Sequence, residues 1–302
     1  MTFLTLVLAL LLERMLPRRL PRTHRWFDTY WQRVTGAGWL RELLGRPWAI
    51  VLALLPPLAL LALLQGLSDP FGSLGALLFG VLVLHYSLGP DELSAQADEF
   101  VRARDAGDQL RASALAQQFC LSEIPEEEPR RSFAVARAVV ILACRRLVGP
   151  VFWFVILGPL GAAAYRLVHL LAARLDDEPV TPEMRRYGEA VRDLADWAPA
   201  RVTAAGYAVA GNFDAVAHAW RHFEYQPGED RLGEGDQLLA QTGLGALDTF
   251  PSDADELAGA TELGGIPLPV PPVVEDALAL VWRSLVVWLA LIAGGSLVAW
   301  IS

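Results

Sequence analysis

The sequence predicts an all-α polytopic membrane protein, with about four transmembrane helices, a broken re-entrant helical hairpin and cytoplasmic amphipathic helices. Of the 302 residues, 54% are hydrophobic, whereas soluble domains have about 45–50% apolar residues. The excess lies in uncharged blocks of about 20 residues, the length that a helix needs to cross a hydrocarbon core of about 30 Å. Between these blocks, apolar residues recur at helical spacing with a polar opposite face.

The N-terminal membrane region is predicted to cover residues 1–89. Its short apolar segment, residues 4–12, lacks the basic start and the cleavage site of a signal peptide, so we expect it to be retained. Residues 48–67 and 71–89 carry no charge and are separated by Ser-Asp-Pro, which predicts an antiparallel transmembrane hairpin. Pro56 and Pro57 must kink the first of these helices, and a neighbouring helix can satisfy the freed backbone groups.

Arginine distribution predicts the orientation, because cytoplasmic loops of membrane proteins are rich in basic residues. The segment before residue 48 contains eight arginines, counted from Arg14 to Arg46, and is therefore placed in the cytoplasm. The transmembrane hairpin crosses the membrane and returns, so residues 90–148 are also placed in the cytoplasm. They are predicted to form an amphipathic helix followed by a second helix from about residue 132 to 148.

The central region, residues 149–215, is predicted to be a broken hairpin followed by the segment Asp-Trp-Ala-Pro-Ala-Arg. Gly158 and Pro159 interrupt the long apolar stretch 149–175, and glycine followed by proline is a strong helix breaker. Two shorter helices would dip into the membrane and return, an arrangement tolerated where protein buries the break. The next apolar run is too short to span the bilayer.

The last part of the chain is predicted to be an acidic mobile loop, residues 216–276, and a C-terminal transmembrane helix, residues 277–302. Residues 224–262 hold ten acidic residues and one arginine, which supplies essentially all of the net charge of −9. Nucleic-acid binding, which needs a basic face, gains no support. The two cysteines do not have metal-ligand spacing, and no phosphate loop or nucleophile elbow is present.

Two charged groups near the membrane are candidate ligand-binding residues. Glu13 and Arg14 end the first apolar segment, either facing a polar cavity or marking the headgroup level. Arg102, Arg104, Asp105 and Asp108 would hold an anionic ligand or, through the carboxylates, a divalent metal. Alternatively, they form the solvated face of an amphipathic helix.

A third candidate group follows the broken hairpin. Asp196 is expected to cap a helix that starts at Pro199, and Trp197 suits a membrane interface. Arg201 then lies on an apolar helix and needs an anion, which is a ligand, a lipid phosphate or a carboxylate of the chain itself.

The histidines predict no metal site. His85 and His169 lie in apolar surroundings and are expected to be packed and hydrogen-bonded. His218 and His222 share a helix face but lack an evident third ligand. No cofactor, metal or catalytic residue is predicted.

Two segments of the sequence resemble a known protein family. "GPVFWFVILGPLGAAAYRLVHLL" followed by "DWAPARVTA" resembles the membrane superfamily that includes adenosylcobinamide-phosphate synthase, the CobD/CbiB family. The resemblance is closer to its AmpE branch, because there it extends from "LLERML" and "RTHRWF" over nearly the whole chain. It points to Tyr165 and Arg166 as further candidate ligand-binding residues.

The chain lacks several polar residues that are typical of the synthase branch. The helix before Phe152 and Trp153 reads "VARAVVILACRRLVGPVFW", without the carboxylates and carboxamide of the synthases. The Asn-Thr-x-Asp motif after the tyrosine is replaced by apolar residues, and an early Gly-Asp-Pro-x-x-x-Pro-His-Pro motif is missing. We therefore expect the amide-forming chemistry of that branch to be lost or altered, and the chain to be a regulator more than an enzyme.

The resemblance to the AmpE branch implies a regulatory or sensory protein of the bacterial inner membrane, acting in β-lactamase induction linked to cell-wall recycling. The expected site is a cytoplasm-facing polar pocket formed by the helix around Arg104, the broken hairpin and Arg201. The expected partners are membrane lipids, a cell-wall-derived or other anionic small molecule and a cytoplasmic muropeptide amidase. A membrane enzyme related to the synthase and a ligand-free membrane scaffold are the alternatives.

Overall fold

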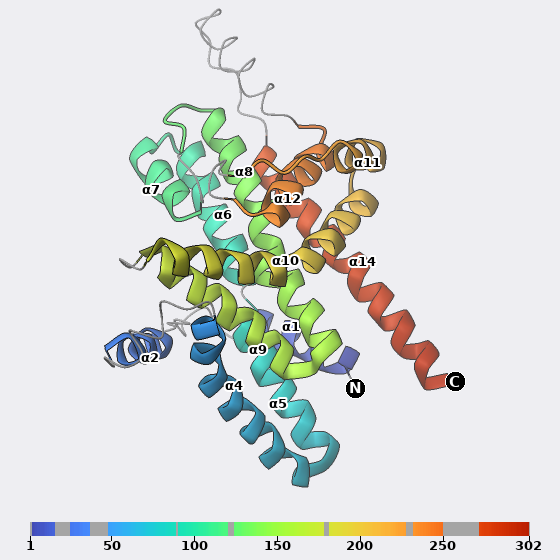
Figure 1. The fold of residues 1–302 in the computed structure, drawn as a ribbon. Coiled ribbons are helices and arrows are strands. Elements are labelled where there is room, and N and C mark those ends of the chain that lie inside the picture. Colours follow the sequence, from blue (N-terminus) through green and yellow to red (C-terminus); the bar gives the residue numbers. More distant parts are fainter. Residues whose placement is uncertain are drawn as a thin grey trace, which may run out of the picture. The chain divides into compact units, whose positions relative to one another are not determined.

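The computed structural model describes residues 2–15, 25–36, 48–88, 90–119, 124–177, 181–227, 232–249 and 272–301. These residues form helices and no strand (Figure 1). The chain divides into two compact units, Met1–Gly89 with Gly149–Asp196, and Pro90–Val148 with Trp197–Ser302.

The helices of the first unit are α1 (Thr2–Met15), α2 (Arg25–Gly36), α4 (Trp48–Ser68), η1 (Asp69–Phe71), α5 (Gly72–Ser87), α9 (Gly149–Asp177) and most of α10 (Pro182–Ala210). The helices of the second unit are α6 (Pro90–Asp105), α7 (Gln109–Phe119), α8 (Arg130–Ala143), the π-helical η2 (Cys144–Val148), the end of α10, α11 (Phe213–Arg221), α12 (Glu234–Ala246) and α14 (Val273–Ile301).

In the first unit, α4 and α5 form the hairpin that the sequence predicts, closed by η1 (Figure 1). Pro57 removes the backbone N–H that would pair with the carbonyl of Ala53 four residues earlier. The hydroxyl of Tyr30, on α2, donates to that carbonyl oxygen at 2.6 Å. The expected compensation by a neighbouring helix is therefore present, and it comes from a side chain.

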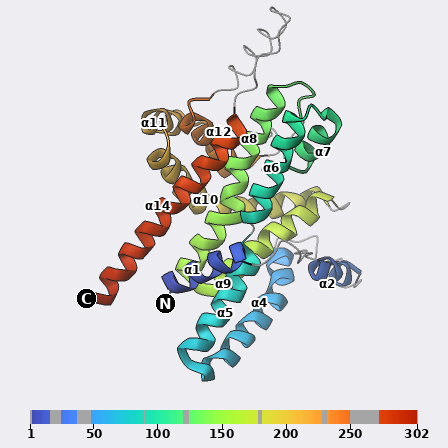
Figure 2. The same ribbon diagram turned by 180° about the vertical axis from the view of Figure 1, so that it is seen from behind.

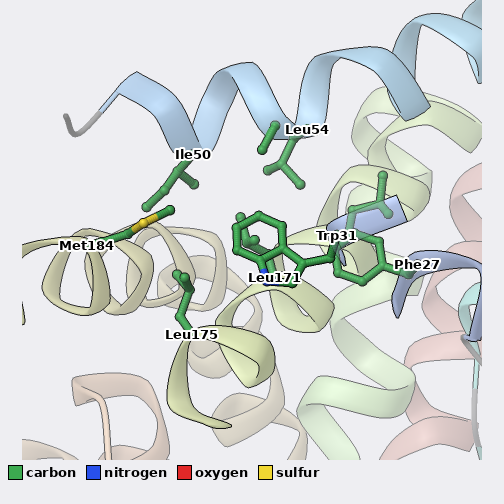
Figure 3. Packing of buried hydrophobic residues seen from close by; sticks show 9 residues of the cluster. Phe27, Trp31, Ile50, Leu54, Leu171, Leu175 and Met184 are labelled. Atoms are coloured by element: carbon green, nitrogen blue, oxygen red, sulfur yellow. The ribbon is translucent and has the colours of Figure 1, made fainter. Parts of the chain in front are cut away.

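A buried apolar cluster joins α2, α4, α9 and α10 in the same unit (Figure 3). Trp31 of α2 lies among the other labelled side chains with Phe27 beside it, and each is about 1% exposed. Ile50 and Leu54 of α4 pack against them from one side, and the other labelled members are Leu171, Leu175 and Met184. This cluster fixes the short amphipathic helix α2 against the longer apolar helices.

In the second unit, α8 is the central helix, with α14 and α12 packed against it and α6 and α7 beside it (Figure 2). Val139 and Val140 of α8 are fully buried. The close approach of α12 depends on Gly243, where an added Cβ would lie 2.8 Å from Val140. The later part of α14 instead exposes large apolar side chains such as Val286 and Val298.

Three helical segments are long and apolar enough to cross a membrane among the described residues: Ile50–Ser68, Arg130–Leu175 and Val273–Ser296. The chain is thus a membrane protein with transmembrane helices. The sequence predicted about four crossings. Helices α1 and α5 have 14 and 16 residues, slightly fewer than the roughly 17–25 of a typical span, so the described residues give three candidate spans. Residues 130–148, predicted as cytoplasmic, belong to the same apolar segment as α9.

The predicted acidic loop over 216–276 is wrong for residues 234–246. These residues form α12, and most of their side chains are buried. The helix forms because its acidic residues find cationic partners and its leucines pack inward, whereas charge and glycine content alone indicated a loop. Residues 216–221 belong to α11 and residues 273–276 to α14, so the loop prediction is wrong for them too. Residues 228–231 and 250–271 lie outside the described residues.

Candidate functional site

The helix break predicted at Gly158 and Pro159 divides α9 into two arms. Gly158 has φ 71° and ψ −157°, a backbone conformation that glycine adopts without steric cost. A Cβ on Gly149 would lie 2.3 Å from the ring of Tyr165, although a straight helix would separate these residues by about 24 Å. The two arms therefore fold back on each other, and the ring of Tyr165 lies directly on the backbone of Gly149.

Asp196 is the polar centre of the first unit. It is 5% exposed, and its Oδ1 accepts a hydrogen bond from the hydroxyl of Tyr165 at 2.6 Å. The Nε2 of His169 lies 2.9 Å from the same oxygen. Because both partners come from the second arm of α9, this carboxylate fastens that arm to α10. His169 is hydrogen-bonded, as the sequence predicted.

The prediction that Asp196 caps a helix starting at Pro199 is wrong. Helix α10 runs without interruption from Pro182 to Ala210 and contains Pro199 in its interior. Proline removes one N–H from a helix and frees the carbonyl four residues earlier, here that of Ala195. The Nε1 of Trp153 donates to this carbonyl oxygen at 3.0 Å. Trp153 lies on the first arm of α9, so both arms are bonded to α10.

A similar side-chain donor occurs in the second unit, where the π-helix η2 follows α8. The N–H of Cys144 bonds to the carbonyl oxygen of Ile141, whereas a regular α-helix would pair it with Val140. The hydroxyl of Tyr207 donates to the Val140 carbonyl oxygen at 2.7 Å. π-Helical turns occur often at functional sites.

Arg201 lies on the exposed end of the family-like segment. Its guanidinium carbon is 4.1 Å from the ring centroid of Trp197, one turn earlier on α10, which is a cation–π arrangement. Its Nη2 donates to Oε1 of Glu234 at 2.6 Å. The anion that Arg201 needs is thus provided by the first residue of α12. Both side chains of this ion pair remain partly exposed, at 28% and 40%.

Arg104 also pairs with carboxylates of the chain. Its Nη2 is 2.8 Å from Glu275 on α14, and its Nε is 2.9 Å from Asp105. Burial alone would lower the pKa of Arg104, but the hydrogen bonds that it donates to Glu275 and Asp105 raise its pKa above the ordinary value. The guanidinium stays charged, as arginine side chains do in proteins. Arg102 is exposed on the same helix.

Helix α12 connects the Arg201–Glu234 pair to a polar pocket in the second unit. Arg145 pairs with Asp236, which is 4% exposed. The pocket has a volume of about 740 Å³ and is bounded by α8, α11 and α12. Its polar lining residues include Arg137, His218, His222, Gln237 and Gln241. The two imidazoles are stacked with centroids 4.2 Å apart.

The predicted site residues fall into both units. Tyr165 and Asp196 meet in the first, while Arg104 and Asp105, and separately Trp197 and Arg201, lie in the second. Arg166 lines an apolar groove in the first unit. The side chains of Glu13 and Arg14 are outside the described residues.

Sequence reasoning missed Glu234, Glu275 and the donor Trp153. A proline within a helix was the one signal that could have indicated a nearby side-chain donor, because it always frees a carbonyl. No cluster of three or more residues able to bind a metal occurs in the part of the chain that the structure describes.

Comparisons with known proteins agree with the sequence resemblance. The family model described as "Regulatory signalling modulator protein AmpE" matches residues 1–225. The chain is 31% identical over 319 residues to "Cobalamin biosynthesis protein CobD" of Stutzerimonas stutzeri (strain A1501), covering 98% of this chain and 99% of the relative. No solved structure gives a significant match.

Proposed function

Because the chain belongs to the AmpE family of regulatory signalling modulator proteins, we propose that it is a multi-pass regulatory protein of the bacterial inner membrane. It modulates β-lactamase induction linked to cell-wall recycling, and it responds to an anionic metabolite. In the proposed topology, the residues before α4 and the helices α6 and α7 face the cytoplasm. The two arms of α9 dip into the membrane and return.

The ion pair between Arg201 and Glu234 is the observation that carries this proposal. A partly exposed pair contributes little to stability, typically about 0–1 kcal/mol, so an anionic ligand can replace the carboxylate at low cost. The stacked Trp197 keeps the guanidinium oriented in either state. Release of Glu234 frees the start of α12, which is the structural change that such a ligand would cause.

The polar pocket bounded by α8, α11 and α12 offers the ligand a place next to this contact. Gln237, one turn after Glu234 on α12, lines the pocket. It also holds Gln226 through two hydrogen bonds, of 3.0 and 2.8 Å. A ligand in the pocket and an anion at Arg201 therefore act on the same helix. The broken hairpin belongs to the other unit, so this proposal places the pocket in the second unit alone.

A charge exchange distinguishes a ligand-binding role of Arg201 from a purely structural one. Arg201→Glu and Glu234→Arg each place like charges together, and the double variant restores the ion pair in reverse. Each variant is expressed in a strain deleted for this gene, and β-lactamase is measured with and without an inducing β-lactam. Membrane abundance is followed by immunoblot. Arg221→Ala, which removes an exposed arginine of α11, is the matched control.

We expect the double variant to recover membrane abundance without recovering normal induction. An anionic ligand cannot bind the carboxylate that replaces the guanidinium at position 201. Recovery of both would support the ligand-free scaffold and overturn the regulatory site. The muropeptide amidase is proposed as the cytoplasmic partner, and its co-purification with the wild-type chain from crosslinked membranes is the corresponding assay.

A membrane enzyme related to the cobinamide-phosphate synthases is the second candidate. The relative named for cobalamin biosynthesis and the buried group of Tyr165, His169 and Asp196 favour it, since a carboxylate-oriented imidazole can transfer protons. Elemental analysis of the purified protein tests it. Stoichiometric divalent metal would support amide or phosphate chemistry, and its absence together with failure to form an amide product would exclude this candidate.

A further inference from the structure

An apolar groove in the first unit is separate from the contacts discussed so far. It has a volume of about 550 Å³ and is lined by side chains of α2, α4, α5 and the second arm of α9. Leucines and other apolar residues form nearly all of its surface, including Leu60 and Leu64 of α4, Phe79 and Leu82 of α5, and Leu170 of α9. Three of these leucines are 44–61% exposed, so the groove opens on the apolar outer surface of the unit.

Arg166 is the charged residue among the described residues that line this groove. It follows Tyr165, whose hydroxyl is bonded to Asp196, and this contact fixes the position of the arm that carries Arg166. Arg166 also lies within the candidate span Arg130–Leu175, where an ionisable residue is costly and is usually functional. A guanidinium has five N–H donors in a planar fork, so it can bind a phosphate while it keeps a protein partner.

Trp26 and Tyr86 also line the groove, and the indole Nε1 of Trp26 donates to the hydroxyl of Tyr86. Tryptophan and tyrosine side chains are enriched where the hydrocarbon core meets the headgroups. A groove that combines an apolar wall, one cation and an interfacial aromatic pair is complementary to an amphiphile with an acyl chain and a negatively charged head. Basic pockets between membrane helices bind anionic headgroups in this way.

We propose that this groove is a specific site for one anionic phospholipid. Its phosphate pairs with Arg166, and an acyl chain lies along the leucines of α4 and α5. A bound lipid would bridge the α4–α5 hairpin and the second arm of α9, and would therefore stabilise the fold of the first unit. This site is independent of the metabolite proposed for the second unit.

Native mass spectrometry of the detergent-purified full chain tests the site. The protein is incubated with an equimolar mixture of phosphatidylglycerol and phosphatidylethanolamine that have identical acyl chains. We expect one retained lipid with a preference of about fivefold or more for phosphatidylglycerol, the size of effect that one cation gives. Arg166→Gln should bring the preference close to one, while Arg166→Lys should keep part of it.

Two further variants and one competitor complete the test. Leu82→Trp fills the groove from its exposed side, so it should reduce retention of both lipids in a folded protein even if Arg166→Gln proves unstable. Arg283→Gln, which removes an exposed arginine of α14, should behave as wild type. Unchanged lipid preference in Arg166→Gln, unchanged retention in Leu82→Trp, or displacement of the lipid by millimolar glycerol phosphate would each overturn the proposal.

Discussion

Trp153→Phe tests the contact between the broken hairpin and α10. The substitution keeps an aromatic ring and removes the Nε1–H that donates to the carbonyl oxygen of Ala195 at 3.0 Å. Because Pro199 has no N–H, that partly buried carbonyl is left without its donor. A fully buried unsatisfied acceptor costs about 1–3 kcal/mol, so we expect a cost near the lower end of this range. The smaller ring adds a packing loss, so the total decrease in the free energy of unfolding does not isolate the hydrogen bond.

Pro199→Ala separates the two contributions, because it supplies a backbone N–H to the same carbonyl. In that background Trp153→Phe loses packing alone, and its cost should be smaller than in the wild type by about 1 kcal/mol or more. Thermal or denaturant unfolding of the purified protein in detergent, for the wild type, both single variants and the double variant, gives this difference. Equal costs of Trp153→Phe in both backgrounds would refute the compensating role of Trp153.

Two other substitutions make predictions for the same unfolding measurements. Tyr207→Phe removes the donor to the Val140 carbonyl oxygen at a fully buried position, so it should lower the free energy of unfolding by about 1–3 kcal/mol; a change below about 0.5 kcal/mol would contradict this role. Gly149→Ala places a Cβ 2.3 Å from the ring of Tyr165, so overpacking should cost roughly 1–3 kcal/mol. If Gly149→Ala were neutral, the two arms of α9 would not be in the contact described.

The sequence was sufficient to predict an all-helical membrane protein, because the signals for that class are local. Uncharged apolar blocks identify membrane helices by length, and Gly158 with Pro159 marks the break in α9 because each residue restricts the backbone by itself. The helix start predicted at Pro199 was wrong because that prediction also used local signals alone. Proline usually marks a helix start, but here Trp153 offsets the hydrogen bond that the interior proline removes.

The candidate site was less predictable, because its contacts join residues distant in sequence. Arg201 was expected to need an anion, yet nothing in the sequence identified Glu234, which lies in an acidic glycine-containing segment typical of a loop. That segment forms α12 because Arg201 and Arg145 neutralise its acidic residues. The pairing of Tyr165 with Asp196 likewise requires α10 to pack against the second arm of α9.

The regulatory role is tested most directly by β-lactamase activity in a strain from which this gene has been deleted, measured with and without an inducing β-lactam. We expect deletion to change the induced level, and the wild-type gene in trans to restore it. Arg201→Ala, present in the membrane at normal abundance, should fail to restore it. An induced level that is the same in the deleted, complemented and Arg201→Ala strains would contradict a role of this protein in induction.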